Sequence, residues 1–152
     1  DKLAKGGNPD AIQFPKAHMD SEYDFSFSGL KSSVLNYING CKMKGESYNP
    51  ADIAASFQKA VIDVLVGHSM EAVSQYHLKK FAIAGGVASN SALRAAFEEA
   101  CRKNGLEFYH PSPIYCTDNA AMIGAAAYYE YLAGTRSGWD LNAVPNLKLG
   151  ER

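Results

Sequence analysis

The sequence predicts a helix-rich α/β fold with a short parallel sheet, on three observations. Residues 80–103 and 106–132 each show a short apolar strand, a turn and a helix. Consecutive strand–helix units of this length favour parallel pairing of their strands. A long helical pattern over residues 49–76 precedes both units. The 152 residues are 47% hydrophobic, with seven Phe and nine Tyr, which excludes a disordered chain.

The first third of the chain predicts mixed structure. Residues 1–5 favour a helical turn that ends at Gly6-Gly7, and residues 11–21 favour a loop. Aromatic and polar residues alternate over 23–28, a two-residue period that predicts a half-buried strand. A helix is expected over 30–38, with Asn39-Gly40 as its end and a polar loop up to residue 48.

The remaining elements carry clearer signals. Asn49 is the expected N-cap of the helix over 49–76, which Gly67 interrupts or kinks, and Pro50 takes its first position. A strand over 80–84 ends in Gly85-Gly86, and Ser89 or Asn90 caps a helix over 91–103. A second strand over 106–109 leads to a loop and a helix from 118 to about 132, which Thr117 or Asp118 caps. This last helix is rich in Ala and Gly, which favours a closely packed core helix over a surface for ligand approach.

The composition limits which partners and which cellular location are expected for the protein. No apolar run approaches the 18 residues of a membrane span. The formal net charge of -1 gives no electrostatic footprint for nucleic acid, although a local basic patch is compatible with it. Three scattered cysteines fit neither a disulfide framework nor a metal knuckle, so we expect a reducing, cytoplasmic location.

Two turns are candidates for a binding site. Gly85-Gly86 and Asn90 join a strand to a helix start, where free N–H groups suit a phosphate, a ribose hydroxyl or a carboxylate. Asp118 stands at the start of the next helix and could ligate a metal. Alternatively, the same residues form only a tight turn and two ordinary helix caps, with no ligand. Both segments follow parallel strands, however, and so they converge on the sheet edge where α/β folds bind ligands.

Three motifs support a resemblance to a known family. DFSFSGLKSS (24–33), GGVASNSALR (85–94) and PIYCTDNAAMIG (113–124) resemble, in order, the C-terminal half of the universal tRNA threonylcarbamoyltransferase family, TsaD/Gcp. The resemblance implies the C-terminal lobe of an actin-like ATPase (ribonuclease H-like) fold. Within it we expect a subdomain insertion over 1–48, a helix and strand–helix core over 49–135, and a tail over 136–152.

The resemblance also implies an activity and a site. Family enzymes transfer a threonylcarbamoyl group from threonylcarbamoyl-adenylate to N6 of the adenosine beside the anticodon of tRNA. They use ATP and one divalent metal, iron or zinc, and bacterial members work with accessory proteins of the pathway. Carried over by motif, Asp1 and Asn90 contact the substrate or nucleotide, and Gly85 and Gly86 let the adenosine approach the backbone. Asp118 becomes a metal ligand.

The departures from the family imply an incomplete enzyme. The paired metal-binding histidines and the first phosphate loop of the family have no counterpart in this sequence, and no general base is evident. We therefore expect a truncated chain that is inactive alone, and the sequence leaves open whether it binds a metal or a nucleotide by itself. Two alternatives stay open: a metalloprotease, the family's older label, and a non-catalytic interaction module. In the second, an exposed sheet edge could pair two copies as a homodimer.

Overall fold

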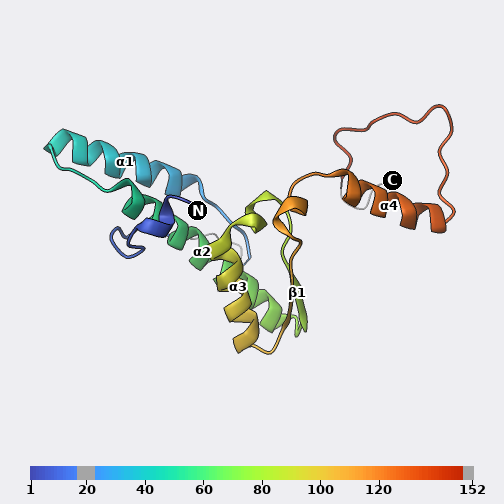
Figure 1. Ribbon diagram of the computed structural model, residues 1–152, viewed down its shortest axis with the longest axis horizontal. Coiled ribbons are helices and arrows are strands. Elements are labelled where there is room, and N and C mark those ends of the chain that lie inside the picture. Colours follow the sequence, from blue (N-terminus) through green and yellow to red (C-terminus); the bar gives the residue numbers. More distant parts are fainter. Residues whose placement is uncertain (17–22, 149–152) are drawn as a thin grey trace. The chain divides into compact units, whose positions relative to one another are not determined.

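A computed structural model describes residues 1–16 and 23–148 (Figure 1). The expected class, helix-rich α/β with a short parallel sheet, is confirmed. Contacts divide the chain into two compact units, 1–116 and 117–152. This division falls elsewhere than the boundaries expected from the sequence, which stay a prediction for the intact fold.

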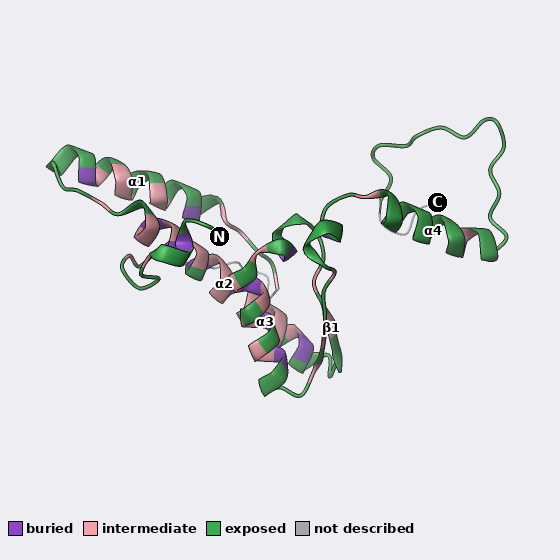
Figure 2. Ribbon diagram, viewed as in Figure 1, coloured by how far each residue is buried: buried purple, intermediate pink, exposed green. Residues whose placement is uncertain are grey.

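Helix α2, Pro50–Gln75, organises the first unit. It begins as expected, because the Asn49 side chain accepts a hydrogen bond from the backbone N–H of Ala51 at 3.0 Å and Pro50 takes the first position. Its apolar face is buried along its length through Ile53, Ala60, Val64 and Val73 (Figure 2). The 3-10 helix η1, Ala4–Gly6, and helix α3, Ser91–Lys103, both pack on α2. The expected interruption at Gly67 is wrong, since the helix runs through that residue unbroken.

Helix α1, Ser28–Lys44, and the segment before it differ from the elements expected from the sequence. The strand over 23–28 is wrong: residues 24–27 form no ladder, and their aromatic rings stack instead, Phe25 on Phe27 at 6.5 Å and on His68 of α2 at 5.5 Å. The expected helix end at Asn39-Gly40 is also wrong. The helix continues to Gly45, whose left-handed conformation (φ 70°) ends it. A glycine inside a helix costs only about 1 kcal/mol, so Gly40 does not stop it.

The sheet pairs β1, Lys80–Ala82, with β2, Glu107–Tyr109, in parallel. Helix α3, Ser91–Lys103, connects them and covers one face. Phe97 of α3, 3% exposed, meets the rings of Phe81 and Phe108 at 4.9 and 6.3 Å. This aromatic cluster fixes α3 on the sheet. The strand–turn–helix–strand order is thus confirmed, and the carboxyl ends of both strands lie at one edge, as expected.

The second unit contains α4, Ala120–Leu132. The expected cap at Thr117 or Asp118 is wrong, because Asn119 accepts the bond from the N–H of Met122 at 3.0 Å. Gly134, with φ 86°, follows the helix end. No residue of α4 is buried (Figure 2), so the expectation of a packed core helix is not met.

None of the helices over the described residues is both long enough and apolar enough to cross a membrane.

Candidate functional site

The loops that follow β1 and β2 are tied together by one side chain. Arg94, the fourth residue of α3, donates through Nε to the backbone oxygen of Ala88 in the glycine turn, residues 85–90. Its terminal nitrogens donate to the backbone oxygen of Pro111 at 2.8 Å and to Nδ1 of His110 at 2.9 Å. A further contact reaches the buried thiol of Cys116 at 3.0 Å. Arg94 therefore links the loops after β1 and β2 through its planar donor set. The expected convergence of the glycine turn with Asp118, which belongs to the second unit, stays a prediction.

A cavity of about 350 Å³ lies beside the start of α3. Two of the residues singled out from the sequence, Asp1 and Asn90, line it together. Its walls are mostly apolar and come from the segment before α1, from α2, from the glycine turn and from α3: Phe27, Ala54, Phe57, Gln58, Val61, Ile62, Val87 and Leu93. An apolar cavity with a few convergent polar groups is the usual form of a small-molecule site.

Asp1 is held at the first turn of α3. One carboxylate oxygen accepts from the backbone N–H of Ser91 at 3.1 Å, and the other accepts from its hydroxyl at 2.8 Å. A carboxylate is favoured there by the partial positive charge of the helix N-terminus. Each oxygen keeps acceptor capacity for a further donor, such as a ligand hydroxyl.

Asn90 uses both ends of its amide within the protein. Its oxygen accepts from the N–H of Leu93 at 2.9 Å and so caps α3, as expected. Its nitrogen donates to the side-chain oxygen of Gln58 at 2.9 Å. Gln58 was not among the residues singled out from the sequence. The available signal was a polar residue on an apolar helical face, one turn from both Ala54 and Ile62.

The glycine turn borders the cavity through Val87. Gly85, with φ 86°, has a backbone conformation that residues with a side chain rarely adopt, and a Cβ there would project into open space. Gly85 and Gly86 are both exposed, and neither lines the cavity. Their contact with an adenosine stays a prediction.

Asp118 belongs to the second unit. Its side chain is exposed, and its carboxylate has no hydrogen bond or ion pair in the described part of the chain. A divalent ion needs several ligands, yet residues 1–16 and 23–148 contain no cluster of three or more His, Cys, Asp or Glu side chains that could hold one. The described residues therefore do not fit a complete metal site, and Asp118 as a ligand stays a prediction.

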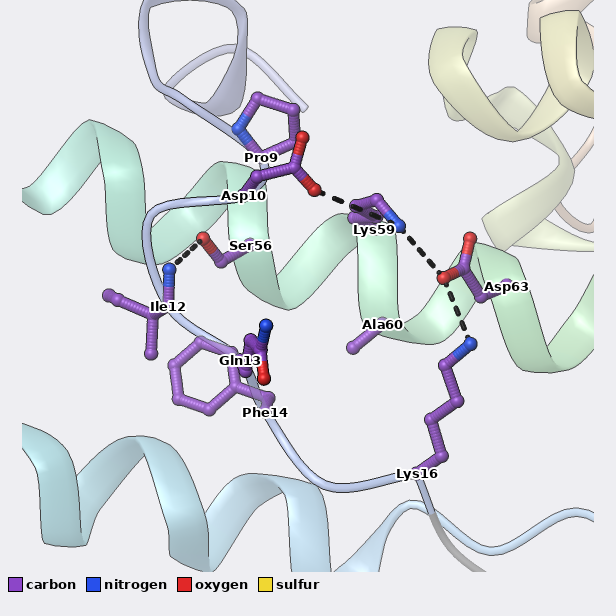
Figure 3. A pocket seen from close by; sticks show the side chains of 10 residues that line it. All are labelled: Pro9, Asp10, Ile12, Gln13, Phe14, Lys16, Ser56, Lys59, Ala60 and Asp63. Atoms are coloured by element: carbon purple, nitrogen blue, oxygen red, sulfur yellow. Dashed lines mark hydrogen bonds and ion pairs between the residues drawn. The ribbon is translucent and has the colours of Figure 1, made fainter.

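A second cavity, of about 280 Å³, lies between residues 9–16 and α2 (Figure 3). In the wall of this cavity the Asp63 carboxylate forms ion pairs with Lys59 at 3.0 Å and with Lys16 at 3.1 Å. Lys59 also forms an ion pair with Asp10, at 4.0 Å. Burial by itself raises the pKa of the Asp63 carboxyl, but the two lysines outweigh burial and hold the pKa below its usual value. Since these two cations and two carboxylates neutralise one another, this cavity offers no uncompensated charge to a ligand.

Comparison with known proteins points to a single family. Residues 1–125 match the family described as TsaD: tRNA N6-adenosine threonylcarbamoyltransferase. Proteins of that name from Clostridium botulinum (strain Hall) and Clostridium kluyveri (strain ATCC 8527) are each 58% identical to the chain, and one from Clostridium beijerinckii is 61% identical. Each alignment covers 100% of this chain and 45% of the relative. The chain, which spans less than half the length of these relatives, belongs to the tRNA N6-adenosine threonylcarbamoyltransferase family.

Proposed function

We propose that this chain forms part of an enzyme that transfers a threonylcarbamoyl group from threonylcarbamoyl-adenylate to N6 of the adenosine beside the anticodon of tRNA. Its share of the work is to hold the adenosine part of the adenylate. The observation that carries this proposal is the cavity that Asp1 and Asn90 line together, although they lie far apart in the sequence. Family membership supports the reaction class.

The chemistry of the cavity suits a nucleoside. Aromatic and branched apolar side chains, among them Phe27, Phe57 and Val87, offer a surface for a planar base. The Asp1 carboxylate accepts the hydroxyls of a ribose. A held adenylate would bring its acyl group to a fixed position, so that attack by the tRNA amine becomes effectively intramolecular.

A metal and protein partners belong to the proposal as well. When bound, a metal would polarise the acyl carbonyl. Asp118 would be one of its ligands, and the other ligands would come from outside the described residues. We propose tRNA and accessory proteins of the same pathway as partners. Iron or zinc as the metal, ATP as a ligand and a cytoplasmic location stay predictions.

A chimaera tests the proposal directly. These 152 residues replace the matching part of the Clostridium botulinum relative, and the protein is supplied with threonylcarbamoyl-adenylate and a tRNA that reads codons beginning with A. Mass spectrometry of the digested tRNA then measures threonylcarbamoyladenosine. We expect product from the chimaera, and at least about tenfold less from its Asp1→Ala and Asp118→Ala variants, since each loses a group that binds or orients a reactant.

Two results would contradict the proposal. A folded chimaera that makes no product would show that these residues do not serve the reaction. Full activity of the Asp118→Ala variant would remove that residue from the site. The 152 residues alone should make no product, because their described part does not assemble the ligands of a metal. Modified tRNA from this chain alone would refute that expectation.

A further inference from the structure

The orientation of two side-chain amides in the cavity is fixed by the backbone. The N–H of Leu93 can only donate, so the Asn90 atom 2.9 Å from it must be the oxygen. The Asn90 nitrogen therefore faces Gln58, and because that nitrogen can only donate, the Gln58 atom 2.9 Å away must also be an oxygen. Backbone, Asn90 and Gln58 form a chain of hydrogen bonds with one allowed direction.

The series of hydrogen bonds ends at a donor group that has no partner in the part of the protein that the structure describes, the side-chain nitrogen of Gln58. The Gln58 nitrogen carries two N–H groups, and it has no hydrogen-bond partner among the described residues. It is also not sealed from solvent, since the buried polar atoms without a partner in the described chain are elsewhere. Asn90, by contrast, has only one N–H left after its bond to Gln58.

We propose that Gln58 is a ligand-binding residue of this cavity. Its oxygen holds Asn90, and its nitrogen donates to an acceptor atom of the nucleoside, either a ring nitrogen or a ribose oxygen. Asp1, which is bonded to Ser91 at the start of α3, supplies acceptors for ligand hydroxyl groups in the same cavity. The cavity thus requires a ligand that combines acceptors with hydroxyl donors, as adenosine does. This inference rests on the proposed function and extends its site by a residue from α2.

Two substitutions separate binding from positioning. Gln58→Glu keeps an oxygen for Asn90 but removes the donors, while Gln58→Met removes both and keeps the shape. Gln75→Glu, at the exposed last position of the same helix, is the control for the added charge. Adenosine is the probe, because a neutral ligand is not repelled by the new carboxylate. Calorimetric titration of the 152-residue chain measures its dissociation constant, and circular dichroism checks that each variant is folded.

We expect Gln58→Glu and Gln58→Met each to weaken adenosine binding by about fivefold to tenfold, the effect of one lost hydrogen bond, while Gln75→Glu leaves it unchanged. Unchanged affinity in Gln58→Glu would overturn the inference, whether or not Gln58→Met binds more weakly, and would leave the proposed function intact. A wild-type chain that binds no adenosine would overturn the inference and would also contradict the nucleoside pocket in the proposed function.

Discussion

Gly7 offers the sharpest test of how the N-terminal segment sits on α2. A Cβ added to Gly7 would lie 2.0 Å from the backbone oxygen of Ala51 and 2.2 Å from its carbonyl carbon. The backbone of Gly7 is extended, with φ -109° and ψ 162°, which any residue adopts. Space alone therefore requires glycine at this position, and Gly7→Ala isolates that requirement.

The size of the effect follows from the clash. The obstructing atoms belong to the first turn of α2, which cannot move without loss of the helix start, so the segment with Gly7 must move by about 1 Å or more. That shift strains the bonds of Asn8 to Asp52 at 2.8 Å and to Ser56 at 3.3 Å. Overpacking of this kind costs about 1–3 kcal/mol, and each broken hydrogen bond adds about 1 kcal/mol. We expect Gly7→Ala to lower the free energy of unfolding by about 2–4 kcal/mol.

Urea unfolding followed by circular dichroism measures this change, since 2 kcal/mol moves the midpoint by about 1 M. The matched control is Gly6→Ala, because a Cβ at Gly6 meets nothing within 4 Å. The control should leave the midpoint nearly unchanged. Equal midpoints for the two variants would refute the packing of residues 4–8 on α2. The same shift would displace Asp1, so Gly7→Ala should also weaken adenosine binding.

Three further predictions concern single side chains. Arg94→Met should lower the free energy of unfolding by about 2–3 kcal/mol, because two backbone oxygens and a histidine lose the hydrogen bond from Arg94. Wild-type stability of this variant in urea would contradict a structural role for Arg94. The pKa of Asp63 is lowered in the folded state, so its stabilising effect is present at neutral pH and is lost as pH falls below about 4. Asp63→Asn should therefore cost about 0.5 kcal/mol at pH 7 and less as the pH falls below about 4, and a difference that does not shrink on acidification would refute the ion pairs. Burial raises the pKa of the Cys101 thiol, which is 1% exposed, so a thiol reagent should label Cys101 only after unfolding, as peptide mapping would show.

Local chemistry explains which elements could be predicted from the sequence. The starts of α2 and α3 depend on caps that lie within three residues of the helix. Asn49 was predicted as the cap of α2, and Asn90 was one of two caps predicted for α3, with Ser89 as the other. The strand over 23–28 failed because a strand needs a partner, and no local pattern says whether one exists. Its aromatic residues pack on α2 instead, as the stacking of Phe25 on His68 shows.

The candidate site could be predicted only in part. Asp1 came from the family resemblance, and Asn90 came from both the turn before its helix and the resemblance. The structure brings the two residues to one cavity. Gln58 could not be found in the same way, since its role depends on which face of α2 meets the cap of α3. Arg94 is a similar case: its partners come from the glycine turn and from the loop after β2, and their meeting is a property of the folded chain.

Helix α4 separates the forces that form a helix from those that bury it. Its sequence contains five alanines in thirteen residues, and Asn119 caps its first turn, so propensity and capping both favour the helix. Small side chains do not by themselves create a partner surface, and Ile123 and Tyr129 remain 64% and 70% exposed. The composition that suggested a core helix therefore specifies only its helical conformation. Burial is decided by residues elsewhere in the fold, which no pattern within α4 can reveal.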